Sequence, residues 1–212
     1  MKIRTWLFRI LAIAMALGIA TAPALAMTVK GDRAAWGEMA AAYKKLNSLS
    51  GYRMKMTTPN GMQMTIDMVP LDTMHMISQM PGGRGSMEIV RIGSRTATRM
   101  DIPGMSSKWQ CGRMAVAPSL PPDPTDLQGT VDISRGPDTQ IAGTPVHTYT
   151  YTVTHTVMGP APQRLVKTTL SVNAQTGFPV RSVTGVGGKS TMTTDYSDYG
   201  AKFVITLPAA CG

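Results

Sequence analysis

Alternation of apolar and polar residues, with a period of two, runs through most of the chain from Tyr52 onward and constrains the fold most strongly. Tyr52–Thr57 alternates, residues 59–61 (Pro-Asn-Gly) supply a hairpin turn, and residues 62–68 alternate on the return. The later stretches expected to be strands are 73–77, 87–92, 96–100, 129–134, 140–142, 145–158, 163–172, 178–186, 189–195 and 202–207. Ten to twelve short strands separated by turns predict a barrel or a strongly curved antiparallel sheet.

One helix is predicted ahead of these strands, over residues 32–49. Asp32 can cap its N-terminus, and Gly51 is the expected stop. Its apolar side chains recur every three or four residues and therefore share one stripe: Trp36, Met39, Tyr43, Leu46 and Leu49. Such a stripe needs an apolar surface, so we expect the helix to pack on the sheet. The fold class is mainly β with one or two helices.

A proline-rich stretch interrupts the strand pattern at about residues 102–126. Proline has no backbone N–H and is poorly tolerated inside a sheet, so this stretch predicts an irregular loop. Trp109 and Cys111 are its expected anchors. Because strands lie on both sides of the loop, residues 27–212 are expected to form a single domain.

The first 26 residues have the features of a cleavable export signal. Basic residues open the chain, an apolar run follows, and residues 24–26 (Ala-Leu-Ala) give a small-x-small cleavage site ending at Ala26. The apolar run is too short to span a bilayer. We therefore expect an exported, periplasmic protein that begins near Met27.

The net charge is mildly positive. Three of the 21 basic residues and none of the 12 acidic ones lie in the signal, so its removal lowers the net charge from +9 to +6. The basic residues are scattered, and no basic motif is interleaved with aromatic residues, which argues against nucleic acid as a partner. This charge would permit transient contact with an anionic membrane surface. A monomer is expected.

Only two cysteines are present, Cys111 and Cys211. In an oxidising compartment the simplest expectation is that they pair with each other. On the chain-entropy model, a bridge that closes about 100 residues contributes about 4–5 kcal/mol.

Methionine is unusually frequent on one side of the predicted sheet. Of the 18 methionines, 12 lie between Met54 and Met114, and in the first strands they occupy alternate positions that share a face. In the stretch 145–158, the tyrosines fall on the inward face and the threonines on the outward face. Methionine is flexible and polarisable, and it suits surfaces that accommodate apolar ligands of variable shape.

Two interpretations of this face stay open: a methionine-biased core, or the lining of a cavity for acyl chains. In the second, the lining residues are Trp36, Met39, Tyr43, Met54, Met56, Met62, Met64, Met68, Met74, Met76, Tyr149 and Tyr151.

Copper is the alternative ligand that the methionines allow. Pairs of thioethers two residues apart recur on successive strands, and soft thioether ligands select Cu(I). The candidate ligands are Met54, Met56, Met62, Met64, Met74 and Met76. Alternating apolar residues in a half-buried strand produce the same spacing without a metal.

Catalytic residues are not predicted. His147 and His155 are eight residues apart in one expected strand, or about 26 Å, which is too far to share a metal or a proton. His75 has no partner in a recognisable motif, and the sequence contains no zinc-protease motif, nucleophile elbow or phosphate loop. We therefore expect neither an enzyme nor a cofactor.

Four stretches carry a resemblance to a known family. They are the helix 32–49 with residues 51–56 (Gly-Tyr-Arg-Met-Lys-Met), the block 143–151, the hairpin 170–181 with its Phe-Pro-Val-Arg end, and the ending 195–208. In this order they resemble the periplasmic outer-membrane lipoprotein carrier (LolA/LolB-like) superfamily. The resemblance implies a half-open antiparallel barrel with the N-terminal helix on its concave face, and an apolar cavity that shelters acyl chains. It supplies no catalytic residues.

The function predicted from the sequence is the binding of a lipid acyl chain or a lipidated protein, as a carrier or a sensor in the periplasm. One alternative is a periplasmic Cu(I)-binding protein. The other is a non-catalytic interaction or regulatory domain, whose partner would contact the threonine face or the proline-rich loop.

Overall fold

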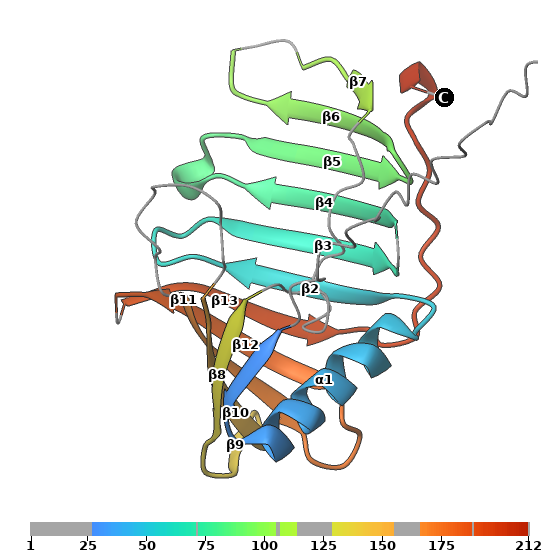
Figure 1. Cartoon of the computed structure of the whole chain (residues 1–212). Coiled ribbons are helices and arrows are strands. Elements are labelled where there is room, and N and C mark those ends of the chain that lie inside the picture. Colours follow the sequence, from blue (N-terminus) through green and yellow to red (C-terminus); the bar gives the residue numbers. More distant parts are fainter. Residues whose placement is uncertain are drawn as a thin grey trace, which may run out of the picture.

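The computed structural model describes residues 27–70, 72–104, 107–113, 129–154, 166–187 and 189–211. These described residues form one α-helix, α1 (Arg33–Asn47), and a single 13-stranded sheet (Figure 1). The strands are β1 (Thr28–Gly31), β2 (Tyr52–Thr57), β3 (Gln63–Val69), β4 (Thr73–Gln79), β5 (Ser86–Ile92), β6 (Arg95–Asp101), β7 (Gln110–Arg113), β8 (Thr130–Arg135), β9 (Thr139–Ile141), β10 (Thr144–Thr154), β11 (Val166–Asn173), β12 (Pro179–Val186) and β13 (Lys189–Ser197). Short 3₁₀ turns cover Pro81–Gly83 and Ala209–Cys211.

The sheet is curved and open, with the order β1-β8-β10-β11-β12-β13-β2-β3-β4-β5-β6-β7 and β9 paired to β10. All neighbours are antiparallel except β1 and β8, which run parallel. The two ends of this path, β1 and β7, do not pair with each other, so the barrel is half-open. The fold class expected from the sequence is confirmed.

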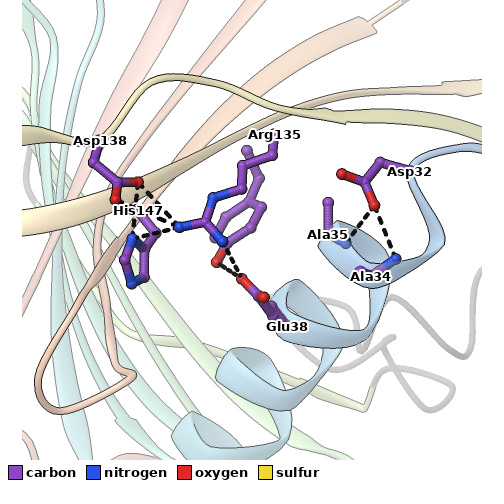
Figure 2. Close-up of polar contacts among 8 residues, drawn as sticks. Asp32, Ala34, Ala35, Glu38, Arg135, Asp138 and His147 are labelled. Atoms are coloured by element: carbon purple, nitrogen blue, oxygen red, sulfur yellow. Dashed lines mark hydrogen bonds and ion pairs between the residues drawn. The ribbon is translucent and has the colours of Figure 1, made fainter.

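The helix begins where the sequence predicts. The Asp32 carboxylate accepts hydrogen bonds from the backbone N–H groups of Ala34 and Ala35 at 2.9 and 3.0 Å, which satisfies two of the unpaired donors of the first turn (Figure 2). The helix ends at Asn47 with Ser48 as its cap, so the expectation that Gly51 stops it is wrong. Gly51 is instead buried in a close backbone contact with Met68 and Ala201.

The apolar stripe of α1 packs on the concave face of one half of the sheet. A buried cluster joins the helix to β8, β10 and β11 and contains Ala35, Met39, Ala42, Tyr43, Val131, Ile133, Tyr149, Leu170 and Val172. A second cluster joins the end of the helix to β2, β3, β4 and β13 and contains Leu46, Tyr52, Met54, Ile66, Met68, Met74 and Tyr196. Figure 1 shows α1 against the half with β8, β10 and β12, with β3–β6 extending beyond it.

Three segments differ from the sequence-based expectation. β1 was not predicted, because four residues are too few to establish a period, and it is fixed by parallel pairing to β8. β7 lies inside the range expected to be an irregular loop and pairs with β6. Residues 202–207 are not a strand, although they alternate between partly buried and exposed side chains.

Residues 201–211, here named the C-terminal strap, cross the outer face of the sheet instead of joining it. The Phe203 ring lies 5.3 Å from the Arg53 guanidinium on β2, and Cys211 is bonded to Cys111 on β7. The five strand spacings from β2 to β7 amount to about 24 Å. The eight residues from Phe203 to Cys211 can reach at most about 29 Å, and the 3₁₀ turn over Ala209–Cys211 shortens this reach, so the strap spans the distance with little length to spare.

The strap faces outward-pointing residues, because Arg53 and Cys111 point away from the side that bears Met54. Val90 and Ala97 also point outward by register, yet both are buried, in agreement with a segment that covers this face. Figure 1 shows the red strap rising past β2 to β7. The disulfide expected between Cys111 and Cys211 is confirmed.

Candidate functional site

Most inward side chains of β2–β6 are apolar, and these apolar residues form a surface here named the methionine face. Strand register places Met54, Ile66, Met76 and Ile89 in a row of directly opposite residues across β2–β5. Shorter pairs flank this row on the same face: Met68 with Met74, Met56 with Met64, and Met87 with Met100. The methionine face consists of these ten residues.

Burial of the ten residues of the methionine face decreases with distance from the helix, whereas the polar side chains on the same side of β4–β6, Ser78, Arg91 and Thr96, are buried. Met54, Met68 and Met74 are buried in the cluster that includes Leu46 of α1. Met56, Met76 and Ile89 pack against that cluster but are only partly buried. At the far strand, β6, Met100 is 46% exposed. Among the described residues no helix covers this half of the sheet, so its apolar side chains lack the cover that the other half receives from α1.

The expected cavity residues do not form one group. Trp36, Met39 and Tyr43 pack with Tyr149 and Tyr151 in the cluster beneath α1, where Met39, Tyr43 and Tyr149 are buried. The expected methionines of β2–β4 lie on the methionine face, and the helix reaches them through Leu46 and Leu49. Met62 precedes β3 and lies in the turn between β2 and β3.

Buried tyrosine hydroxyls from the two apolar clusters lie close to one another. Burial raises the pKa of Tyr43, and the nearby hydroxyls of Tyr196 and Tyr151 raise it further. Burial also raises the pKa of Tyr196 to about 12, partly offset by a hydrogen bond with Ser182. These hydroxyls therefore stay neutral and form a polar cluster under α1. Tyr196 is not among the site residues expected from the sequence, because its inward direction depends on pairing between β13 and β2.

A polar network attaches the outer side of α1 to the sheet, and we name it the helix latch (Figure 2). Tyr149 donates a hydrogen bond to Glu38, and Arg135 lies 3.4 Å from the same carboxylate oxygen. Arg135 also ion-pairs with Asp138 at 3.2 Å, and His147 Nδ1 lies 2.9 Å from both Arg135 and Asp138. An open cleft of about 390 Å³ adjoins the latch beside Lys45 and Asn173.

Charge holds the latch together over the physiological range. The hydrogen bonds from His147 and Arg135 lower the pKa of Asp138. Asp138 in turn raises the pKa of Arg135, chiefly through the same hydrogen bond. Because the folded-state pKa of Asp138 is depressed, its contribution to stability is present above the unfolded pKa and is lost as the pH falls through the folded value.

Truncation of Glu38 tests the latch. Glu38→Ala should lower the free energy of unfolding by about 1–3 kcal/mol, because it leaves the hydroxyl of a covered tyrosine without its acceptor. Glu38→Gln keeps an oxygen acceptor for Tyr149 and loses only the charge, so it should cost clearly less. Urea unfolding measures both variants. Equal losses would show that the hydrogen bond from Tyr149 does not hold the helix.

No group of three His, Cys, Asp or Glu side chains in the described part of the chain is placed to hold a metal ion. Methionine sulfur is not among these ligand types. Strand register brings only some of the six expected copper ligands directly opposite one another. Met56 lies directly opposite Met64, whereas Met54 faces Ile66 and Met74 faces Met68. Within the described ranges, no helix is long and apolar enough to cross a membrane.

Comparison with solved structures identifies the fold. LppX, a lipoprotein of Mycobacterium tuberculosis, is similar over 83% of this chain and 100% of its own, at 13% sequence identity and a TM-score of 0.57. LprF of Mycobacterium bovis is similar over 86% of this chain and 100% of its own, at 13% identity and a TM-score of 0.56. A LolA superfamily protein of Nitrosomonas europaea also matches, at 11% identity and a TM-score of 0.31.

No protein-family model matches the chain, and no curated protein matches it. The chain shares its fold with LppX and LprF: a curved, open antiparallel sheet with the N-terminal helix on the concave side, which is the architecture that the sequence resemblance implies.

Proposed function

We propose that this protein is exported and binds the acyl chain of a lipid or a lipidated protein on the methionine face, as a carrier or a sensor and not as an enzyme. The observation that carries the proposal is the burial gradient of that face. Apolar side chains from five adjacent strands point to the concave side, yet α1 covers only their first members. A partly exposed apolar surface of this kind marks a ligand or partner site.

The chemistry of the face suits an acyl chain. Burial of an acyl chain away from water gains about 0.8 kcal/mol per methylene, so burial of a dozen methylenes could offset the cost of leaving a membrane. Flexible methionines can adapt to chains of different length and unsaturation. The fold shared with LppX, which is a lipoprotein, agrees with export to a compartment where lipids are handled. The net charge of +6 without residues 1–26 supports transient contact with anionic membranes.

A charge placed on the methionine face tests the proposal. Met64 is partly buried on the concave side of β3, so Met64→Asp should prevent acyl-chain binding while the fold survives. Thr65 is the next residue along β3 and points outward, opposite Lys55 of β2. Thr65→Asp adds the same charge on that side, and this variant should bind lipid as the wild type does. Delipidated protein titrated with oleic acid and monoolein, read by native mass spectrometry, measures both. Unchanged binding in Met64→Asp would refute the site.

Cu(I) binding is the second candidate, and one observation favours it. The directly opposite pair Met56 and Met64 brings two thioethers within reach of one ion, since such pairs have Cβ atoms about 4.5–5.5 Å apart. Native mass spectrometry of the unheated periplasmic protein separates the candidates. Extra mass that organic extraction removes supports lipid, and a shift matching copper that Met56→Leu abolishes supports the metal.

A further inference from the structure

One arginine faces the concave side among the methionines. Arg91 on β5 lies directly opposite Met74 of β4 and Thr96 of β6, so its side chain shares the face of the buried Met68–Met74 pair. The residue is only 5% exposed. Its Nε donates a hydrogen bond of 3.2 Å to the backbone carbonyl oxygen of Asp72.

Arg91 differs from the other arginines that are at least partly buried. Arg53, Arg99 and Arg181 each lie 2.6 Å from a carboxylate oxygen, of Asp67, Glu88 and Asp195 respectively. Those pairs lie on the outer face. Arg91 is the most buried of the four, and no carboxylate of the described residues forms an ion pair with it.

A guanidinium carries five N–H donors in a planar fork. The carbonyl of Asp72 accepts from one of them, and no other described residue hydrogen-bonds to Arg91, so its two terminal nitrogens can donate to a further acceptor. A buried charge without a counter-ion costs free energy, and a bidentate carboxylate or phosphate group is the partner whose geometry fits the fork.

We propose that Arg91 is the binding site for the anionic headgroup of an acyl ligand whose chain lies along the methionine face. The inference rests on the proposed function and names the ligand class: a single-chain lipid that ends in a carboxylate or a phosphate. Arg91 stands beside Met74 at the buried end of the face, so the headgroup is anchored there and the chain extends toward Met76 and Ile89.

Ligands with one acyl chain and different headgroups test the proposal on the full mature protein after delipidation. The ligands are oleate, oleoyl lysophosphatidic acid and monoolein, which is neutral, each titrated below its micellar concentration by calorimetry. The wild type should bind the anionic ligands at least about tenfold more tightly than monoolein, because hydrogen bonds to charged groups are the strong ones. The stronger of the two anionic ligands identifies a fatty acid or a phospholipid as the source.

Arg91→Met replaces the guanidinium by a side chain typical of this face and should remove the preference while leaving monoolein binding unchanged. Arg91→Lys keeps the charge and should retain part of the preference. Arg95→Met, an exposed arginine on the outer side of β6, is the matched control and should behave as the wild type. Retention of the full preference in Arg91→Met would overturn the assignment.

The two proposals fail in different ways. If the wild type binds all three ligands equally, the headgroup site is wrong and the acyl-chain site stands. If the wild type binds none of them, both proposals are refuted.

Discussion

Gly51→Ala should lower the free energy of unfolding by about 3 kcal/mol, the upper part of the usual range for overpacking. A Cβ atom at this position would lie 2.5 Å from the carbonyl oxygen of Ala201 and 2.9 Å from that of Met68. Both atoms belong to the backbone, so no side chain can rotate away to relieve the contact. The Gly51 carbonyl also accepts a hydrogen bond from the Gly200 N–H at 2.8 Å, which ties the start of β2 to the start of the C-terminal strap.

Gly37→Ala is the matched control for this prediction. Gly37 lies inside α1 and is exposed, and a Cβ atom there would meet nothing within 4 Å. Alanine is favoured over glycine inside a helix, so this variant should raise the stability by up to about 1 kcal/mol. Chemical denaturation of both variants measures the difference. A neutral Gly51→Ala would mean that the strap does not press against β2.

Removal of the disulfide should lower the free energy of unfolding more than either Gly51→Ala or Glu38→Ala. The bond between Cys111 and Cys211 has a sequence separation of 100 residues. On the chain-entropy model, its loss in the Cys111→Ser, Cys211→Ser double variant costs about 4–5 kcal/mol. Denaturation of the double variant, compared with the wild type in its oxidised and reduced forms, measures this loss.

The strap gives a second readout of the same variant. Without the disulfide, the contact of Phe203 with Arg53 remains, but the far end of the strap is no longer covalently held. Carboxypeptidase should therefore remove the last residues of the double variant and of the reduced wild type, and spare the oxidised protein. Equal resistance of all three would show that non-covalent packing alone fixes the strap.

The elements predicted correctly from the sequence are those with local signals. The helix 32–49 was placed within two residues at its C-terminal end, because its cap and stripe lie in consecutive residues. The β2–β6 meander was also predicted, since each of its strands returns through a short turn. The inward direction of Met54, Met74 and Tyr149 followed from the period of two and agrees with their burial.

The features that the sequence did not reveal depend on long-range contacts. Residues 202–207 have the alternation of a strand, but hydrogen bonding to a neighbouring strand, and not alternation, makes a strand. The position of Arg91 among the methionines follows only from strand register, which places it opposite Met74. The helix latch joins Glu38 to residues about 100 positions later in the sequence, so no local sequence pattern predicts it.

The pairing of β13 with β2, here named the seam, has a consequence for how the chain folds. The strands β2–β6 pair with their sequence neighbours, and so do β10–β13, so each group can form with little loop-closure entropy. The seam instead joins residues 52–57 to residues 189–197, across nearly the whole chain. Because it closes a long loop, we expect it to form after the two meanders, and it then completes the buried cluster of Tyr52, Met54 and Tyr196. We therefore expect the half that holds the methionine face to form as a local unit and to pair with β13 late in folding.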